Sequence, residues 1–317
     1  MKRVSVIIPT YNSPYLPQAI ESVFQQGHET TEIIVVDSSP EVTLDQIADC
    51  FGRIRHISQP PRGVSQARNV GIAAAQGEYV ALLDADDLWL PGKLQTQLSL
   101  LERYPGAGFC FSTTWNLFKV EDCAIPSEPY RPPELRFWIE SEGQANGAVY
   151  GDVYELLLSA NCVATSSVVA RKTAIVSVGL FDESLKNGED YDFWLRLASA
   201  FPAIYVCEPT SRYRVHSDGL SGTWGSRSEL FYRANLRVLE KHLANVPSLM
   251  VRNALSRLLA DLANFQLKSA QRTEAKRTAL QSLRVRPNLK ATQTFIELAF
   301  PKAYSLAVDL LHGSRAS

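Results

Sequence analysis

Three aspartates within four residues, Asp84, Asp86 and Asp87, follow directly on an apolar run at residues 80–83. A run of this length is typical of a buried strand, which places the acids at a strand end. Carboxylates this close repel one another unless a cation or a cluster of donors lies among them. Mg²⁺ and Mn²⁺ take oxygen ligands and share them with phosphates, so this pattern could hold a diphosphate through a metal. The alternative is a solvated acidic turn in which Asp87 caps the helix that follows.

A second acidic cluster contains Glu189 and Asp190, which we expect in the first turn of a helix. This helix would turn Phe193, Trp194 and Leu197 toward the core, because apolar residues recur there at helical spacing. A carboxylate held near an apolar wall is what a general base requires. Acids in a first turn favour any helix, so a purely structural role is the alternative.

Polar groups that could bind a nucleotide occur in three further places. Residues 6–12 predict a strand that ends in Pro-Thr-Tyr-Asn, whose groups could hold a base and a ribose, although any loop could use them. Residues 62–72 place Arg68 on a helix opened by glycine and serine, where free backbone N–H groups favour anions; a surface arginine is the alternative. Arg214 and His216 offer a cation and an imidazole, although a lone histidine is more often structural.

The elements that must position these residues alternate along the first hundred residues. Short apolar runs predict strands, and apolar positions at helical spacing predict helices. Such alternation indicates an α/β sheet with mainly parallel order, in which ligands lie beyond the carboxyl ends of the strands. Asp37 is among the polar residues that follow these strands. The predicted strands are 4–8, 32–37, 54–57, 78–83 and 165–170, and the predicted helices are 15–26, 43–50 and 64–76.

Two later regions differ from this pattern. Residues 118–150 lack clear periodicity and are rich in proline, glutamate and aromatic residues, so we predict a long, partly ordered loop that carries function. From residue 227 to the end the pattern is helical. Residues 227–317 hold 15 Lys and Arg against 6 Asp and Glu, whereas residues 1–226 hold 17 against 27. We therefore predict two parts with separate roles, a domain at 1–226 and a basic helical extension at 227–317.

The composition is that of an ordinary globular protein. The 317 residues carry a net charge of −1, and 45% are hydrophobic and 21% charged. No apolar run reaches the length of a membrane span, and the start leads into a strand rather than a signal-peptide region. The five cysteines are odd in number and scattered, which disfavours a disulfide framework or a zinc site and fits a reducing cytosol. We expect a cytoplasmic protein.

Six segments in order along residues 4–221 resemble the family 2 glycosyltransferases, the inverting enzymes of the GT-A fold. Any one segment could arise by chance, but six in family order are highly specific. The resemblance implies the α/β, Rossmann-like GT-A fold of nucleotide-diphospho-sugar transferases, followed here by the helical extension. Ser38 stands where the family often has a second acid that contacts the base. The six segments are 4–12, 32–37, 63–71, 77–87, 179–183 and 189–196.

The resemblance also implies roles for single residues. Asp86 would bind Mn²⁺ or Mg²⁺, Asp84 would lie beside it near the ribose or diphosphate, and Asp190 would be the catalytic base. His216 is similar to the family's late histidine near the metal and would be a second metal ligand. Together with the polar groups above, the expected nucleotide-sugar-binding residues are Pro9, Tyr11, Asn12, Asp37, Arg68, Asp84 and Glu189.

We therefore expect a metal-dependent, hexosyltransferase-like inverting enzyme that moves a sugar from a nucleotide-diphosphate donor to an acceptor hydroxyl. The family implies a glycan or lipid-linked acceptor in surface polysaccharide or glycolipid assembly, and no nucleic acid as partner. The alternatives are a non-catalytic sugar-nucleotide-binding module and a nucleotidyltransferase, although the latter would usually show a basic, Gly-rich loop after the first strand. The extension could pack on the domain, form a subunit contact or make peripheral contact with an anionic membrane.

Overall fold

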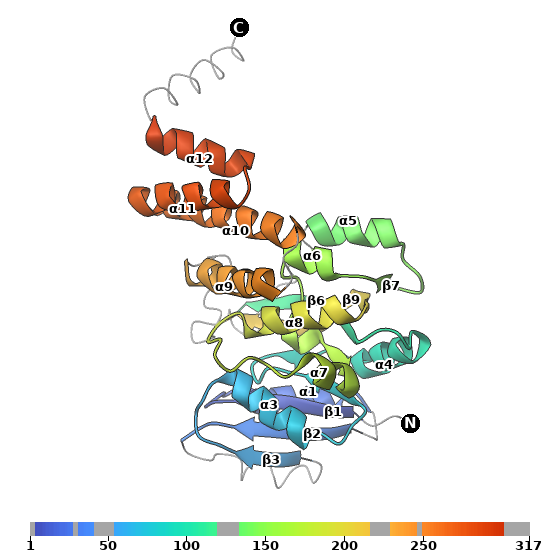
Figure 1. The fold of residues 1–317 in the computed structure, drawn as a ribbon. Coiled ribbons are helices and arrows are strands. Elements are labelled where there is room, and N and C mark those ends of the chain that lie inside the picture. Colours follow the sequence, from blue (N-terminus) through green and yellow to red (C-terminus); the bar gives the residue numbers. More distant parts are fainter. Residues whose placement is uncertain are drawn as a thin grey trace. The chain divides into compact units, whose positions relative to one another are not determined.

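The computed structural model has a sheet with covering helices in one compact unit, Met1–Trp224, and a set of helices in a second, Gly225–Ser317 (Figure 1). The helix predicted at 43–50 and the candidate metal ligand His216 fall outside the residues that the structure describes. The described residues are 4–27, 31–40, 54–118, 133–215, 229–245 and 249–300.

The first unit is built on a mixed sheet, which has nine strands within the described residues. In spatial order they are β3 (Ile54–Ser58), β2 (Thr31–Asp37), β1 (Val4–Thr10), β4 (Tyr79–Leu82), β8 (Val169–Arg171), β6 (Phe109–Phe118), β9 (Ala203–Val215) and β5 (Leu88–Trp89), with β7 (Ala148–Gly151) paired to β9. The first four strands are parallel, as predicted, whereas β8 runs antiparallel to both β4 and β6. Because β1, β2 and β4 are parallel, the loops that follow them meet at one edge of the sheet.

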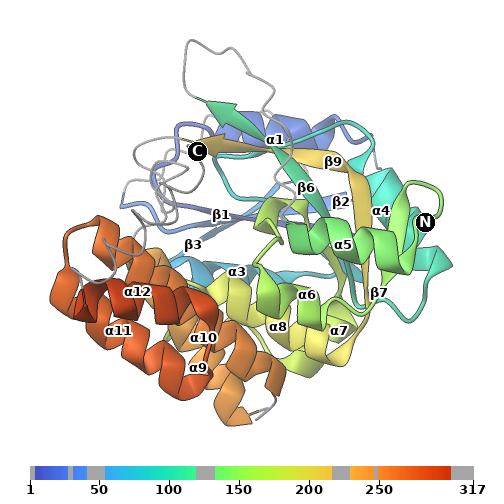
Figure 2. The ribbon, with the colours of Figure 1, turned by 90° about the horizontal axis from the view of Figure 1, so that it is seen from above.

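Helices cover both faces of this sheet. They are α1 (Leu16–Phe24), α3 (Val64–Ala74), α4 (Lys93–Arg103), α5 (Pro133–Glu142), α6 (Tyr154–Ser159), α7 (Lys172–Val178) and α8 (Glu189–Ala200), with a 3₁₀ turn, η1 (Thr165–Ser167). Val6 and Ile8 of β1 are buried in a cluster with side chains of α1 and α4, whereas Ile7 meets Gly71 of α3. Successive side chains of a strand point to opposite faces, which explains this division. Figure 2 shows α1 and α4 on one side of the sheet and α3, α7 and α8 on the other.

Two predictions about local structure are wrong. The described part of residues 118–150, predicted as a partly ordered loop, instead contains regular elements, because α5 buries Leu135 and Trp138 and β7 pairs with β9. β7 has only four residues and their burial does not alternate, so it gives no periodic signal in the sequence. The strand predicted at 165–170 begins instead with η1, and the strand β8 is short. The Ser167 hydroxyl closes that turn by donating to a main-chain carbonyl at 2.7 Å, which competes with extended structure.

The second unit confirms the predicted helical extension. Its helices are α9 (Glu229–Asn245), α10 (Leu249–Lys268), α11 (Arg272–Val285) and α12 (Leu289–Ala299). Ala275 and Ala279 of α11 are fully buried, and the Ser282 hydroxyl donates to the Ser256 carbonyl of α10 at 2.7 Å. The side chain of Asn288, which precedes α12, donates to both serine hydroxyls at 2.8 Å. Within the described ranges, none of the helices combines the length and the apolar character that crossing a membrane requires.

Candidate active site

The acidic sequence after β4 forms a tight turn. The Asp87 N–H donates to the Asp84 carbonyl at 3.0 Å, and the Leu83 N–H donates to the Ile7 carbonyl of β1 at 3.1 Å. The turn therefore starts where the parallel pairing stops. Asp84 and Asp86 are partly buried, whereas Asp87 is only 2% exposed. The three acids consequently occupy different environments.

Asp87 points inward and anchors this acidic turn. Its carboxylate accepts the Ser166 hydroxyl at 2.5 Å and the Arg214 N–H of β9 at 2.9 Å. Burial, together with the nearby charges of Asp86 and Asp84, raises the pKa of Asp87 well above its ordinary value. Asp87 is thus a structural anchor between η1 and β9 rather than a helix cap, because α4 starts several residues later.

One residue that holds the turn, Ser166, was not identified from the sequence. Its hydroxyl accepts the Asp84 N–H at 3.1 Å, and its carbonyl accepts the Trp89 indole N–H at 2.8 Å. Arg214, noted in the sequence only as a possible cation, donates through its guanidinium to the Asp86 carbonyl at 2.9 Å. Ser166 stands in an ordinary Thr-Ser-Ser run that carries no recognisable motif. Only its position in the fold identifies its role.

Arg68 links the acidic turn to the second acidic cluster. It projects from α3, is 4% exposed, and donates to Asp84 at 2.8 Å and to Glu189 at 2.9 Å. Its guanidinium also lies 5.3 Å from the ring centre of Phe181. Burial lowers the pKa of Arg68, but the two carboxylates outweigh it, and the pKa lies above its ordinary value. The structure therefore brings these three predicted residues together, and Arg68 is not a surface arginine.

Asp190 stands in the first turn of α8, beside this network. Gly188 precedes the helix with a φ of 79°, a conformation that glycine adopts without strain. Asp190 is partly buried, and its carboxylate accepts the Tyr191 N–H at 2.7 Å. Burial and the charge of Glu189 raise the pKa of Asp190 to about 7, and the charge of Arg68 opposes this rise. A carboxyl group that exchanges its proton near neutral pH suits a general base.

The remaining described candidates lie at the ends of β1 and β2. Asp37 is 3% exposed, and its carboxylate accepts the Ser39 N–H at 2.9 Å. The Ser39 hydroxyl accepts the Asn12 N–H at 2.8 Å, which ties the loop after β1 to the loop after β2. Tyr11 is 59% exposed, whereas Pro9 is buried within β1. These loops therefore present Tyr11 and Asn12 at the same edge of the sheet as the acidic turn.

The acidic turn offers the oxygen donors that hard divalent cations prefer. Among the residues that the structure describes, no three His, Cys, Asp or Glu side chains form a group that could hold a metal alone. Asp86, which lies between Asp84 and Asp87 in the turn, is the candidate ligand by its position. Mg²⁺ at a nucleotide usually takes one or two carboxylates and completes its shell with phosphate oxygens and water. The donor set therefore fits a cation that is shared with a bound diphosphate.

Residues 5–144 match the family model described as glycosyl transferase family 2. An uncharacterized glycosyltransferase of Rickettsia bellii is 32% identical over 220 residues, which cover 68% of this chain and 29% of that protein. An uncharacterized glycosyltransferase of Rickettsia typhi is 27% identical over 268 residues, which cover 84% of this chain and 80% of that protein. The match thus spans less than a third of the first relative and most of the second.

The fold is similar to that of solved structures of S. aureus TarS. The crystal structure of TarS 1–349 in complex with UDP-GlcNAc matches with a TM-score of 0.64 at 18% identity, over 95% of this chain and 88% of that one. The complex with UDP matches with a TM-score of 0.58 at 20% identity, over 99% and 87%. At such identities the likeness bears on the fold alone, and it confirms the predicted GT-A fold with a helical extension.

Proposed function

We propose that this chain, a member of glycosyl transferase family 2, transfers a sugar from a nucleoside-diphosphate donor to an acceptor hydroxyl with inversion at the anomeric carbon. One observation carries the proposal. Asp190, whose pKa is about 7, lies beside the Arg68 that joins Glu189 to Asp84 of the acidic turn. The chain thereby combines a base with a turn suited to a diphosphate, which are the two parts that this transfer needs.

Asp190 would act on the acceptor. Its carboxylate takes the proton of the attacking hydroxyl while the hydroxyl oxygen bonds to the anomeric carbon from the face opposite the leaving diphosphate. This direct displacement passes through no covalent intermediate, so the configuration inverts. Burial and the charge of Glu189 keep Asp190 basic enough to accept a proton near neutral pH, and Arg68 holds Glu189 in place.

The acidic turn would hold the donor's diphosphate. Asp86, with Asp84 beside it and His216 from later in the chain, would bind Mn²⁺ or Mg²⁺, and such a cation offsets the charge that develops on the leaving diphosphate. Arg68 fixes the orientation of Asp84 through the contact at 2.8 Å. The Arg68 guanidinium also contacts Glu189 of α8. It therefore fixes the acidic turn, which would hold the sugar nucleotide, relative to Asp190.

A nucleotide sugar as donor is supported by the solved structures that share this fold, since TarS was determined in complex with UDP and with UDP-GlcNAc. Tyr11, Asn12 and Asp37 would contact the base and ribose, with buried Pro9 shaping the strand beneath them. Ser38 occupies the place of the second acid, and its hydroxyl accepts the Gln59 amide at 3.2 Å. Contacts to the base from this position would therefore be uncharged.

The acceptor would be a glycan or a lipid-linked glycan of surface polysaccharide or glycolipid assembly.

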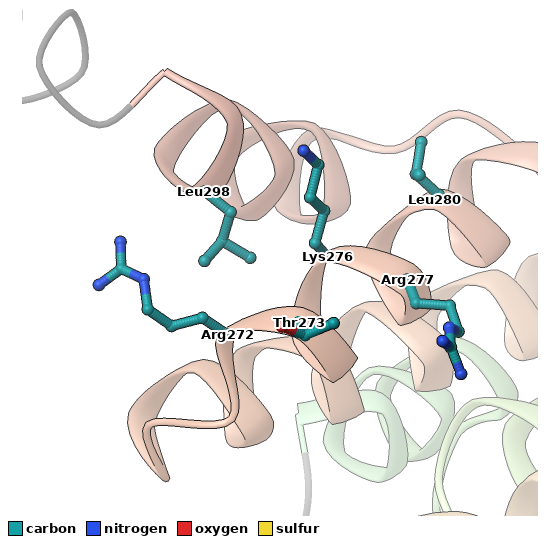
Figure 3. A pocket seen from close by; sticks show the side chains of 6 residues that line it. All are labelled: Arg272, Thr273, Lys276, Arg277, Leu280 and Leu298. Carbon is teal, nitrogen blue, oxygen red and sulfur yellow. The ribbon is translucent and has the colours of Figure 1, made fainter.

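The second unit would make peripheral contact with an anionic membrane through basic side chains around a hollow. This hollow of about 450 Å³ opens along α11 and is closed on one side by α12. In Figure 3, Lys276 extends toward α12 while Arg272 reaches out at the edge of the hollow. Each basic side chain near an anionic surface contributes about 1 kcal/mol of attraction. The hollow is lined by Arg272, Thr273, Lys276, Arg277, Leu280 and Leu298.

Flotation of the whole chain with anionic phosphatidylglycerol vesicles at low and high salt tests the membrane contact. We expect salt-sensitive binding that the double variant Arg272→Gln, Lys276→Gln weakens. The matched double variant Arg252→Gln, Arg284→Gln loses the same charge from exposed positions outside the hollow and should bind more strongly than the first. Absence of wild-type binding at low salt would exclude the contact.

The proposed reaction is tested by a panel of sugar nucleotides with Mn²⁺, in which the released nucleotide is identified. Release of a nucleoside diphosphate supports sugar transfer. Release of pyrophosphate would indicate a nucleotidyltransferase, and binding without release would indicate a non-catalytic sugar-nucleotide-binding module. Inversion is read from the anomeric configuration of the product.

The base is tested by Asp190→Asn, which keeps the size and the hydrogen bond to Tyr191 but cannot take a proton. Donor binding, followed by thermal shift, should persist while transfer falls on the order of 10²–10⁴-fold. Asp152→Asn is the matched control, because Asp152 accepts the Tyr154 N–H at 2.8 Å in a similar way at the exposed start of α6. A loss below about tenfold would place the base elsewhere.

A further inference from the structure

Ser166 lies where η1 meets the acidic turn. Thr165, Ser166 and Ser167 of η1 are 7%, 1% and 0% exposed. The Ser166 hydroxyl donates to the Asp87 carboxylate at 2.5 Å and accepts the Asp84 N–H at 3.1 Å. A single buried hydroxyl therefore holds both ends of the acidic turn, one through a side chain and the other through the backbone.

The segment that carries Ser166 is itself held by buried donors. The Trp89 indole N–H donates to the Ser166 carbonyl at 2.8 Å. The Lys93 ammonium and the Gln97 amide both donate to the Ser167 carbonyl at 2.8 Å, and these two side chains are 1% and 0% exposed. These contacts restrain η1 on this side, so its hydroxyl holds the acidic turn from a well-supported position.

We propose that Ser166 is a positioning residue that presets the acidic turn for the diphosphate and its cation, an inference that rests on the proposed function. Ser166 acts through Asp84 and Asp87 and touches neither ligand. The Ser166 hydroxyl and the Arg214 main-chain N–H both donate to the buried Asp87 side chain. If the Ser166 hydroxyl is removed, Asp87 keeps the Arg214 donor alone of this pair, and the Asp84 N–H loses its acceptor. The turn then has to reorganise when the cation and diphosphate bind, which weakens their binding.

The test compares Ser166→Ala with Ser167→Ala in the whole chain. Ser167 is equally buried, but its hydroxyl donates to the Ala164 carbonyl at 2.7 Å and accepts the Ser112 N–H at 3.3 Å, so it makes neither contact to the acidic turn. The first readout is the increase in melting temperature that Mn²⁺ with UDP produces. The second is the Mn²⁺ concentration that gives half-maximal release of nucleoside diphosphate.

We expect Ser166→Ala to raise the half-maximal Mn²⁺ concentration on the order of tenfold and to reduce the Mn²⁺-dependent thermal shift. Ser167→Ala should leave both readouts near those of the wild type, and Ser166→Thr, which keeps a hydroxyl, should restore them. If Ser166→Ala and Ser167→Ala lower the melting temperature alike and neither changes the Mn²⁺ dependence, Ser166 is merely structural and the proposal is overturned.

Two further outcomes remain decisive. If Ser166→Ala does not fold, Ser166→Cys replaces it, because a thiol is a weaker donor; an unchanged Mn²⁺ dependence in that variant overturns the proposal. A wild-type chain that shows the Mn²⁺-dependent shift with UDP but releases no nucleoside diphosphate from any donor overturns the proposed function alone. In that case the thermal readout still decides the role of Ser166.

Discussion

Asp190→Asn should stabilise the first unit at the same time as it slows transfer. The wild-type carboxyl group has a pKa of about 7 against an ordinary value of 3.8, because it is buried beside Glu189. Ionising it therefore costs about 4 kcal/mol more in the folded state than in the unfolded chain. Since Asp190 is only partly buried, solvent screens part of this cost, and we expect about 2 kcal/mol of added stability in the variant.

This gain should depend on pH in one direction. Between about pH 4 and about pH 7 the folded protein holds a proton on Asp190 that the unfolded chain has released, so the wild-type free energy of unfolding falls as the pH rises through this window. Below the window the carboxyl group is protonated in both states, and above it the group is ionised in both. Asparagine does not titrate. The gain should thus be small near pH 4, grow up to pH 7 and then stay level.

Thermal unfolding across this pH range measures the effect. For a unit of this size, about 2 kcal/mol corresponds to a rise in melting temperature of roughly 4–8 °C. The control Asp152→Asn makes the same chemical change at an exposed position, and the gain is read as the difference between the two variants at each pH. A melting temperature of Asp190→Asn at or below that of the wild type above pH 7, or a gain that does not vary with pH, would refute the view that the carboxylate is destabilised by burial.

Three further predictions concern the metal, the base and the core. Asp86→Ala should remove the Mn²⁺-dependent part of nucleotide binding and abolish turnover without unfolding the chain; full activity in this variant, or of the wild type in EDTA, contradicts the metal assignment. Glu189→Gln removes a charge that raises the pKa of Asp190, so the acidic limb of the pH–rate profile should move to lower pH, and a limb that stays in place would show that Glu189 does not tune the base. Gly71→Ala places a Cβ 2.4 Å from the Ile7 side chain. It should cost about 1–3 kcal/mol and lower the melting temperature, whereas an unchanged value would mean that α3 can move away from β1.

The features that could be predicted from the sequence are those that depend on neighbours in the chain. The strand before Asp84 and the helix that carries Asp190 follow from local apolar patterns. These inferences needed only the spacing of residue types. The contact of Arg68 with Asp84 was not among them, because it joins two segments that no local pattern brings together.

The other features depend on distant partners. Ser166 escaped prediction because its partner Asp87 lies 79 residues away and a Thr-Ser-Ser run has no periodic signal. The strand β7 escaped for the same reason, since it exists through its pairing with β9. The pKa of Asp190 is set by burial and by its approach to Glu189 and Arg68, which no sequence spacing specifies. The ligand roles of the residues at the ends of β1 and β2 stay predictions.

Because Asp87 is anchored by residues far downstream, the site matures late as the chain leaves the ribosome. Its two donors follow it by 79 and 127 residues. The second donor belongs to β9, which also pairs with β5, β6 and β7. A nascent chain, which emerges at about 5–20 residues per second, can pair β1, β2 and β4 well before this strand exists. Its acidic turn lacks the Arg214 donor until β9 is in place, so the turn can reach its final form only after most of this unit has been synthesised.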